Sequence, residues 1–440
     1  MANEAMRKLE RLYVTKVQRR IDEIGRYVCC EHVPVTDVAV AETSEHLTPQ
    51  AAAGLDFQAA YDGQRWGSPW GTAWFRLRFT VPEAFAGEAV ALLFDPEGEC
   101  IVFRDGEPVQ GLDRNRKEYV VCEEAAGGEA VELLVEAGAS GAFGRFEKRT
   151  MHQPRLAVVL PEVWEAWHDL AALAGLIDPL PDDDTRRARL IKGLSDAVDG
   201  FDYQDLCRDA LRASARRVRE AVRPLLASPA CASAQTIACM GHAHIDVAWL
   251  WPLAETIRKC GRTFSTALAY MDHYPDYLFC QSQPQLYEFT RDRYPSLYER
   301  IREKVEAGQW VPTGCMWVEA DCNVTSGESL VRQILFGTRF FAEEFGHEVA
   351  CLWLPDVFGY SAALPQLLRR SGIRYFLTQK ISWSQFTTFP YHTFWWEGID
   401  GSTVLAHFPP ANDYNSRLRA DQMLAAARRY REKDRSPIQA

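Results

Sequence analysis

The chain has 440 residues, of which 47% are hydrophobic and 25% charged, and its formal net charge is -11 at pH 7. These values are typical of a globular protein of two or three domains, and the negative charge argues against a binder of nucleic acid phosphates. No apolar run is long enough to span a bilayer and no signal-peptide segment opens the chain. We therefore expect a cytoplasmic protein with no nucleic acid and no membrane partner.

The first 160 residues are predicted to form a helix followed by a β-sandwich. Apolar residues recur at helical spacing within residues 1–34. Segment 74–82 then alternates apolar and polar residues, which predicts a half-buried antiparallel strand. Asp105 and Gly106 mark a hairpin turn. Together with further short apolar runs, these features predict a jelly-roll-like antiparallel sandwich over residues 35–160.

Residues 161–234 are predicted to be helical and to end in a linker of small residues at 227–234. From residue 235 to 440, apolar strands alternate with amphipathic helices, which predicts a parallel sheet or barrel. The strands are expected at 237–240, 277–280, 310–317, 350–354, 375–378, 393–396 and 404–407, and two of the helices at 285–306 and 328–345. In either architecture the active site lies at the carboxyl ends of the strands.

Candidate metal ligands follow the first and fourth of these strands. His242, His244 and Asp246 occupy alternate positions just after the strand at 237–240, so they point the same way if the strand continues. Asp356 follows the strand at 350–354 in the same manner. Imidazole and carboxylate ligands suit Zn²⁺ or a similar first-row ion. Taken alone, Asp356 could instead cap a helix.

Further acidic and aromatic residues stand at the same strand ends. Glu319 and Asp321 follow the strand at 310–317, where they could bind substrate or merely face solvent. Tryptophans are frequent there, and indole faces pack on the C–H faces of sugar rings while carboxylates bind the hydroxyls. The combination of one metal, carboxylates and tryptophans favours a carbohydrate substrate.

These motifs resemble those of family 38 glycoside hydrolases, the class II α-mannosidases. GHAHIDVAW at 241–249 resembles the metal motif of the family, and WLPDVFGYS at 353–361 resembles its nucleophile motif. WVEADCN at 317–323, followed by SGESLVRQ at 326–333, is similar to a third block and indicates the cytosolic branch. WEGIDGS at 396–402 with HFPP at 407–410 is similar to a later block.

The resemblance implies a retaining α-mannosidase with a seven-stranded β/α barrel behind the sandwich, acting on a mannose-containing oligosaccharide or mannoside. It implies that His244, Asp246 and Asp356 bind Zn²⁺, or Co²⁺, and that Asp356 is also the nucleophile. His242 would support these ligands from behind. Trp249 would pack against the mannose, and we include Glu319, Asp321 and Tyr360 among the expected substrate-binding residues. The full-length form is expected to be a homo-oligomer.

The chain departs from the family pattern after Tyr414. The family has a fourth metal ligand, a histidine, well beyond the nucleophile, and an acid/base carboxylate in a GDGGGG block, and neither motif is present. We therefore expect this chain to be the N-terminal part of a longer enzyme, with a truncated barrel. We expect it to be weak or inactive alone, because loss of a general acid typically costs about 10²–10⁴ in rate.

Two alternatives remain open on the residues alone. A metal-dependent amidohydrolase or deacetylase can also begin with His-x-His on a barrel strand, but it needs a metal-binding lysine or further histidines on later strands. Lys380 is the only lysine near a strand end. The second alternative is a non-catalytic carbohydrate-binding fragment.

Overall fold

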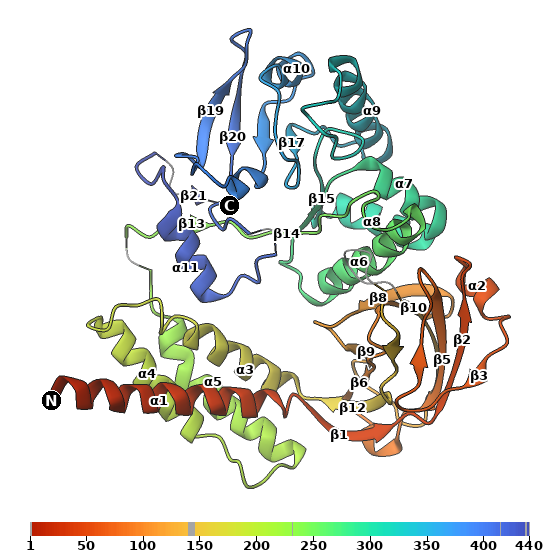
Figure 1. The fold of residues 1–440 in the computed structure, drawn as a ribbon. Helices are drawn as coiled ribbons and strands as arrows, with labels where there is room; N and C mark the ends of the chain where they lie inside the picture. The colour runs from red at the N-terminus through yellow and green to blue at the C-terminus, as the bar shows by residue number, and fades with distance from the viewer. Residues whose placement is uncertain (1, 140–145, 231, 414, 436–437, 440) are drawn as a thin grey trace.

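The computed structural model describes residues 2–139, 146–230, 232–413, 415–435 and 438–439. Figure 1 shows a group of helices around the N-terminal helix, a β-sandwich beside it, and an α/β part above both that holds the C-terminal half of the chain. None of the helices in the described ranges combines the length and the apolar character needed to cross a bilayer.

Two antiparallel sheets form the sandwich, as the sequence predicts. The strand order is β3-β2-β5-β10-β7-β8 in the larger sheet and β1-β12-β6-β9 in the smaller one. The bounds are β1 Cys29–Pro34, β2 Asp37–Thr43, β3 Gln58–Ala59, β5 Thr72–Thr80, β6 Ala89–Leu93, β7 Glu99–Arg104, β8 Glu107–Leu112, β9 Glu118–Cys122, β10 Ala130–Gly138 and β12 Arg155–Val159. The connections include α2 Pro49–Ala52, η1 Glu83–Phe85 and the short pair β4 Arg65–Trp66 with β11 Arg149–Thr150.

The hairpin expected at Asp105 and Gly106 joins β7 to β8. Both residues have positive φ, 53° and 82°, which matches the right-handed twist of the flanking strands. Strand β5, in contrast, is not simply half-buried. Trp74 and Phe75, on opposite faces, are both buried, because a helix of the α/β part covers the outer face of this sheet.

Four helices pack together next to the sandwich (Figure 1). They are α1 Ala2–Gly25, α3 Pro161–Ala174, α4 Thr185–Asp199 and α5 Arg208–Leu226. Val17 and Ile21 of α1, Leu170 of α3 and Val218 of α5 belong to one buried apolar cluster that continues into the sandwich. The predicted helical region 161–226 is therefore helical, and the N-terminal helix packs against it.

The α/β part contains short parallel strands between longer helices. The strands are β13 Thr236–Ile237, β14 Gly241–His242, β15 Phe279–Gln281, β16 Trp310–Pro312, β17 Cys351–Trp353, β18 Tyr375–Leu377, β19 Thr393–Glu397, β20 Thr403–His407 and β21 Ile438–Gln439. The helices are α6 Leu253–His273, α7 Pro284–Arg293, α8 Pro295–Glu306, α9 Gly327–Phe345, α10 Leu364–Arg370, α11 Ala420–Arg429 and the short η3 Lys380–Trp383.

The expected seven-stranded barrel is not confirmed. Strands β14-β15-β16 form one parallel sheet, β17-β18-β20-β19 form another in which β19 is antiparallel, and β13 pairs with β21. After β16 the chain runs as loop up to a single bridge between Cys322 and Tyr360, so no ladder joins the two larger sheets within the described residues.

The prediction of a single helix over residues 285–306 is wrong. The structure has two helices there, α7 and α8, which are separated at Tyr294 and Pro295. Proline disfavours helical geometry at the residue before it, and Tyr294 has a φ of -133°.

A buried group of charges joins the sandwich to α6; we call it the interdomain charge cluster. It consists of Glu99 on β7, Glu136 on β10, and Glu255, Arg258 and Arg262 on α6. Glu255 lies between the two guanidinium groups, at 2.5 Å from Arg258 and 2.6 Å from Arg262. Arg262 also contacts Glu99, and Arg258 lies 3.7 Å from Glu136. Burial, opposed by Arg258, raises the pKa of Glu136 to about 7.

Candidate metal centre

Three predicted ligands converge at the carboxyl ends of β14 and β17. Nε2 of His244 lies 3.2 Å from Oδ1 of Asp246 and 3.3 Å from Oδ2 of Asp356. One ligand atom from each of the three residues lies within 4.8 Å of the others. His244 and Asp246 come from the loop between β14 and α6, and Asp356 follows β17, so two separate sheets contribute to the cluster. One imidazole nitrogen and two carboxylate oxygens at this spacing form a possible metal site.

The carboxylates around His244 favour a positive charge at the centre of this cluster. Burial opposes a charge on His244, but hydrogen bonds to Asp246, Asp356 and Glu319 raise the pKa of its ring to about 12. Burial likewise opposes a charge on Asp356, yet His244 and Lys380 lower the pKa of its carboxyl. Without a bound cation, the ring holds a proton among three carboxylates. A divalent cation would take the place of this proton.

Glu319 lies behind His244. Its Oε1 accepts from Nδ1 of His244 at 2.9 Å, and its side chain is only 6% exposed. The other oxygen, Oε2, is buried with no hydrogen-bond partner among the described residues. Burial raises the pKa of Glu319, against the effect of His244. In this arrangement a buried carboxylate holds the ring of His244 by its Nδ1; the substrate contact predicted for Glu319 stays a prediction.

Gln283 fixes the relative position of the two loops. Its Nε2 donates to the carbonyl of Ile245 at 2.8 Å, and its Oε1 accepts from the backbone N–H of Glu319 at 3.0 Å. The residue has a φ of 67°, a left-handed conformation that a side chain disfavours. Sequence analysis did not select Gln283, although it follows the end of β15 just as the chosen residues follow other strands.

Lys380 contacts Oδ1 of Asp356 from the end of β18 and is buried. Its ammonium group also lies 3.5 Å from the ring centre of Trp383 and 4.7 Å from that of Phe358. This pairing differs from the metal-binding lysine that an amidohydrolase would need. The sequence marked Lys380 as a strand-end lysine, but nothing in the pattern indicated its partner.

Tyr360 holds the loop that carries Asp356. Its hydroxyl contacts the carbonyls of Leu354 and Val357, at 3.2 and 2.8 Å, and the hydroxyl of Thr378. These contacts occupy the hydroxyl and bracket Asp356 on both sides along the chain. Tyr360 therefore holds the loop around Asp356, and the substrate contact predicted for it stays a prediction.

The remaining predicted residues are less closely joined to the cluster. Asp321 is exposed, and its Oδ1 accepts from the backbone N–H groups of Asn323 and Val324 at 2.8 Å, so it stabilises its own loop. Trp249 is 50% exposed and packs edge-on against Trp251, with ring centres 5.5 Å apart. The ring of His242 lies 5.1 Å from that of Trp353. Burial and then His244 lower the pKa of His242 to about 3, so its imidazole is neutral.

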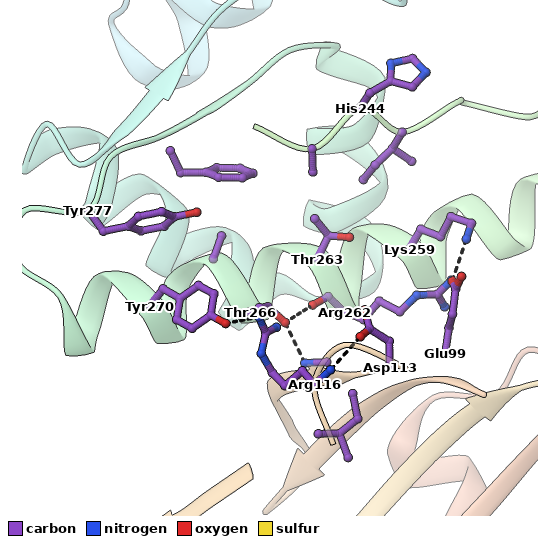
Figure 2. Close-up of a pocket in the computed structure, with 16 residues that line it drawn as sticks. Glu99, Asp113, Arg116, His244, Lys259, Arg262, Thr263, Thr266, Tyr270 and Tyr277 are labelled. Atoms are coloured by element: carbon purple, nitrogen blue, oxygen red, sulfur yellow. Dashed lines mark hydrogen bonds and ion pairs between the residues drawn. The ribbon is translucent and has the colours of Figure 1, made fainter. Parts of the chain in front are cut away.

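A cavity of about 350 Å³ lies beneath the strand end 243–245, between α6 and the sandwich. In Figure 2 the ring of His244 points away from the other labelled residues that line this cavity. Among the charged groups that line it, Glu99 pairs with Lys259 at 2.7 Å and with Arg262, and the guanidinium of Arg116 contacts the hydroxyl of Tyr270. This cavity is therefore separate from the metal centre.

Comparison with known proteins defines the class. Residues 234–438 match the family described as glycosyl hydrolases family 38 N-terminal domain, and residues 33–165 match the α-mannosidase jelly roll domain. The chain therefore contains a glycoside hydrolase family 38 N-terminal domain preceded by an α-mannosidase jelly roll domain. The two matched ranges correspond to the α/β part and the sandwich.

Among curated proteins, the chain is 39% identical to human "Alpha-mannosidase 2C1" over 418 residues, which is 92% of this chain and 40% of that protein. It is 35% identical over 427 residues to "Alpha-mannosidase G" of Dictyostelium discoideum, 93% of this chain and 39% of that protein. The chain thus spans about two fifths of the length of these relatives. A solved α-mannosidase from Enterococcus faecalis V583 aligns at a TM-score of 0.38 and 20% identity, over 47% of this chain and 24% of that one.

Proposed function

We propose that this chain carries the nucleophile and the metal ligands of a retaining α-mannosidase that removes terminal α-mannosyl residues from oligosaccharides or mannosides. The observation that carries the proposal is the convergence of His244, Asp246 and Asp356 on one point. We infer that the sugar in the substrate is mannose because these relatives are named α-mannosidases.

The donor set fits a first-row divalent ion. It offers one nitrogen and two oxygens, and Oε2 of Glu319 and Nε2 of His242 are buried nearby without a hydrogen-bond partner among the described residues. We propose Zn²⁺, with Co²⁺ as a substitute, held by His244, Asp246 and Asp356. When bound, the ion would act as a Lewis acid that orients the sugar hydroxyls and stabilises developing charge.

Asp356 is proposed as the nucleophile. Its carboxylate would attack the anomeric carbon and form a bond to it while the bond to the leaving oxygen breaks; water would then release the sugar with retained configuration. Lys380 and His244 keep Asp356 ionised, as a nucleophile requires. We assign no described residue as the acid that protonates the leaving oxygen.

The other residues have proposed supporting roles. Glu319 orients His244, His242 lies behind the ligands, and Tyr360 positions the nucleophile loop. The exposed indole of Trp249 offers a face for the mannose ring. We further propose domain boundaries at residues 34, 160 and 234, supported by the matched ranges 33–165 and 234–438, and a cytoplasmic location.

Two measurements test this function. Purified protein should bind about one Zn²⁺ or Co²⁺ per chain, and His244→Ala should abolish this binding. A mechanism-based fluorinated mannosyl reagent should label Asp356 in the metal-loaded chain, because trapping needs the nucleophile more than the acid. Labelling of a different residue, or hydrolysis of an amide substrate, would contradict the proposal.

A further inference from the structure

A buried threonine on α6 holds the loop that carries Asp246 and Trp249. Thr256 lies in the first turn of α6 and is fully buried. Because helical side chains tilt toward the N-terminus of their helix, its hydroxyl reaches back over the loop at 246–252. Its Oγ1 donates to the carbonyl of Val247 at 2.7 Å and shares this proton with the carbonyl of Asp246 at 3.1 Å. Thr256 therefore fixes the backbone at the proposed ligand Asp246.

The same hydroxyl also holds the other end of this loop. Nε1 of Trp251 donates to Oγ1 of Thr256 at 2.9 Å. A threonine hydroxyl has one proton to donate and two lone pairs that accept, so it can make all of these contacts at once. Threonine is branched at Cβ and has few rotamers, which gives the hydroxyl a defined direction. One side chain thus joins the backbone at Asp246 to the indole of Trp251.

The indole of Trp251 is held at one face as well. Nζ of Lys259 lies 4.7 Å from its ring centre, and an ammonium group over an indole face attracts the ring. Lys259 is three residues after Thr256 and therefore lies on the same side of α6. Its ammonium group lies 2.7 Å from Glu99 on β7, a contact drawn in Figure 2. The position of Trp251 accordingly depends on α6 and on the sandwich.

Trp251 in turn supports Trp249. The two rings meet at 89°, with centres 5.5 Å apart. Trp249 is half exposed, whereas Trp251 is partly buried beneath its own contacts. An exposed indole presents one face in one direction only where a fixed neighbour holds it. The edge-on contact with Trp251 supplies such a neighbour, and Thr256 fixes that neighbour in place.

We infer that Thr256 is a positioning residue that sets the indole pair Trp249–Trp251 relative to Asp246. This inference rests on the proposed function, in which Asp246 binds the metal and Trp249 packs against the mannose. Thr256 acts through the loop at 246–252, with the metal ligand at one end and the indole pair toward the other. Trp251 belongs to the second end alone, so it contributes to the affinity for α-mannosides and not to the affinity for the metal.

The test measures two affinities of the 440-residue chain and its variants. Competition with a chromophoric chelator gives the affinity for Zn²⁺, and ligand-observed NMR titration gives the affinity of the Zn²⁺-loaded chain for methyl α-mannoside. Thr256→Val keeps the shape of the side chain and loses its hydrogen bonds. Loss of one hydrogen bond typically changes an equilibrium by about 2–13-fold. We therefore expect Thr256→Val to bind both Zn²⁺ and the sugar about threefold or more weakly.

Two further variants separate positioning from general packing. Thr256→Ser restores the hydroxyl and should bring both affinities within about twofold of the wild type. Trp251→Phe keeps a ring for Lys259 and Trp249 but has no N–H group. It should weaken sugar binding about threefold or more and leave Zn²⁺ binding within about twofold of the wild type.

Thr290→Val is the matched control. Thr290 is as fully buried as Thr256, but it lies on α7 and its hydroxyl donates to the carbonyl of Leu286 in its own helix, at 2.8 Å. The same substitution there should leave both affinities within about twofold of the wild type. A Thr256→Val variant that behaves like Thr290→Val would overturn the inference.

The other outcomes are equally decisive. If Thr256→Ser fails to restore the affinities, or if Trp251→Phe loses Zn²⁺ affinity along with sugar affinity, the positioning role is wrong. If the wild-type chain binds no Zn²⁺, or binds Zn²⁺ but no methyl α-mannoside, the proposed function fails and the inference fails with it. Where Thr256→Val folds poorly, the selective loss of sugar binding in Trp251→Phe decides the question.

Discussion

Replacement of Glu319 should weaken metal binding although Glu319 is not itself one of the three proposed ligands. Its carboxylate accepts the Nδ1 proton of His244 at 2.9 Å and is almost wholly buried. This bond leaves Nε2 facing Asp246 and Asp356, the direction from which a metal would be bound. Glu319→Gln keeps an oxygen at this place without its charge, whereas Glu319→Ala removes the acceptor.

The size of the effect follows from this one bond. A hydrogen bond to a charged group contributes about 1.5–3 kcal/mol, and a partner behind a metal-bound histidine typically accounts for about 10–100-fold in affinity, equal to about 1.4–2.7 kcal/mol. We expect Glu319→Gln to weaken Zn²⁺ binding about tenfold and Glu319→Ala to approach a hundredfold. Competition with a chromophoric chelator measures both dissociation constants.

Asp321 is the matched control. It stands two residues away and also carries a carboxyl group, but it is exposed and accepts hydrogen bonds from its own loop. Asp321→Asn should change Zn²⁺ affinity less than twofold. The reasoning is refuted if Glu319→Gln binds Zn²⁺ as tightly as the wild type, or if Asp321→Asn loses as much affinity as Glu319→Gln.

Two further predictions concern stability. A Cβ atom at Gly337 would lie 2.2 Å from the carbonyl oxygen of Cys315, so Gly337→Ala should destabilise the protein by about 1–3 kcal/mol in thermal unfolding. Gly327→Ala, on the same helix but in open space, should cause no loss, and equal losses in the two variants would contradict this. Attraction to Arg262 lowers the pKa of Glu99 to about 2, below its value of roughly 4.3 in an unfolded chain. Its stabilising contribution is therefore complete above the unfolded pKa and is lost as pH falls toward 2. The difference in urea unfolding free energy between wild type and Glu99→Gln should be constant from pH 8 to 5.5 and shrink below about 4.5; growth of this difference in acid would be inconsistent with the ion pair.

Local patterns predicted most of the secondary structure, and the failures have physical causes. Asp105 and Gly106 suit a two-residue turn, so β7 and β8 could be anticipated. The proline after Tyr294 was present in the sequence, yet the apolar spacing continues across it and suggested one helix. Trp74 could not be assigned to a covered face, because the helix that covers it lies about 180 residues further along the chain.

That His244, Asp246 and Asp356 lie close together could be predicted from their positions at strand ends. His244, Asp246 and Asp356 each follow a short apolar run, and the strand ends do meet. Sequence could not separate Glu319 from Asp321, because both follow the same strand and only their burial distinguishes them. The contacts of Gln283 and Lys380 depend on how loops far apart in the sequence lie next to each other, and the spacing of apolar residues does not predict this.

The interdomain charge cluster also limits how this chain can be recombined with its relatives. Its acids Glu99 and Glu136 lie in the sandwich, and its arginines lie on α6, beyond the linker at 227–234. In a chimera joined at that linker, Arg258 and Arg262 would keep Glu255 on their own helix, but Glu99 and Glu136 would face another parent's helix. A buried charge left without its partner there costs about 3–5 kcal/mol. The unit that can be exchanged between relatives is therefore the sandwich together with α6, and it crosses the apparent domain boundary.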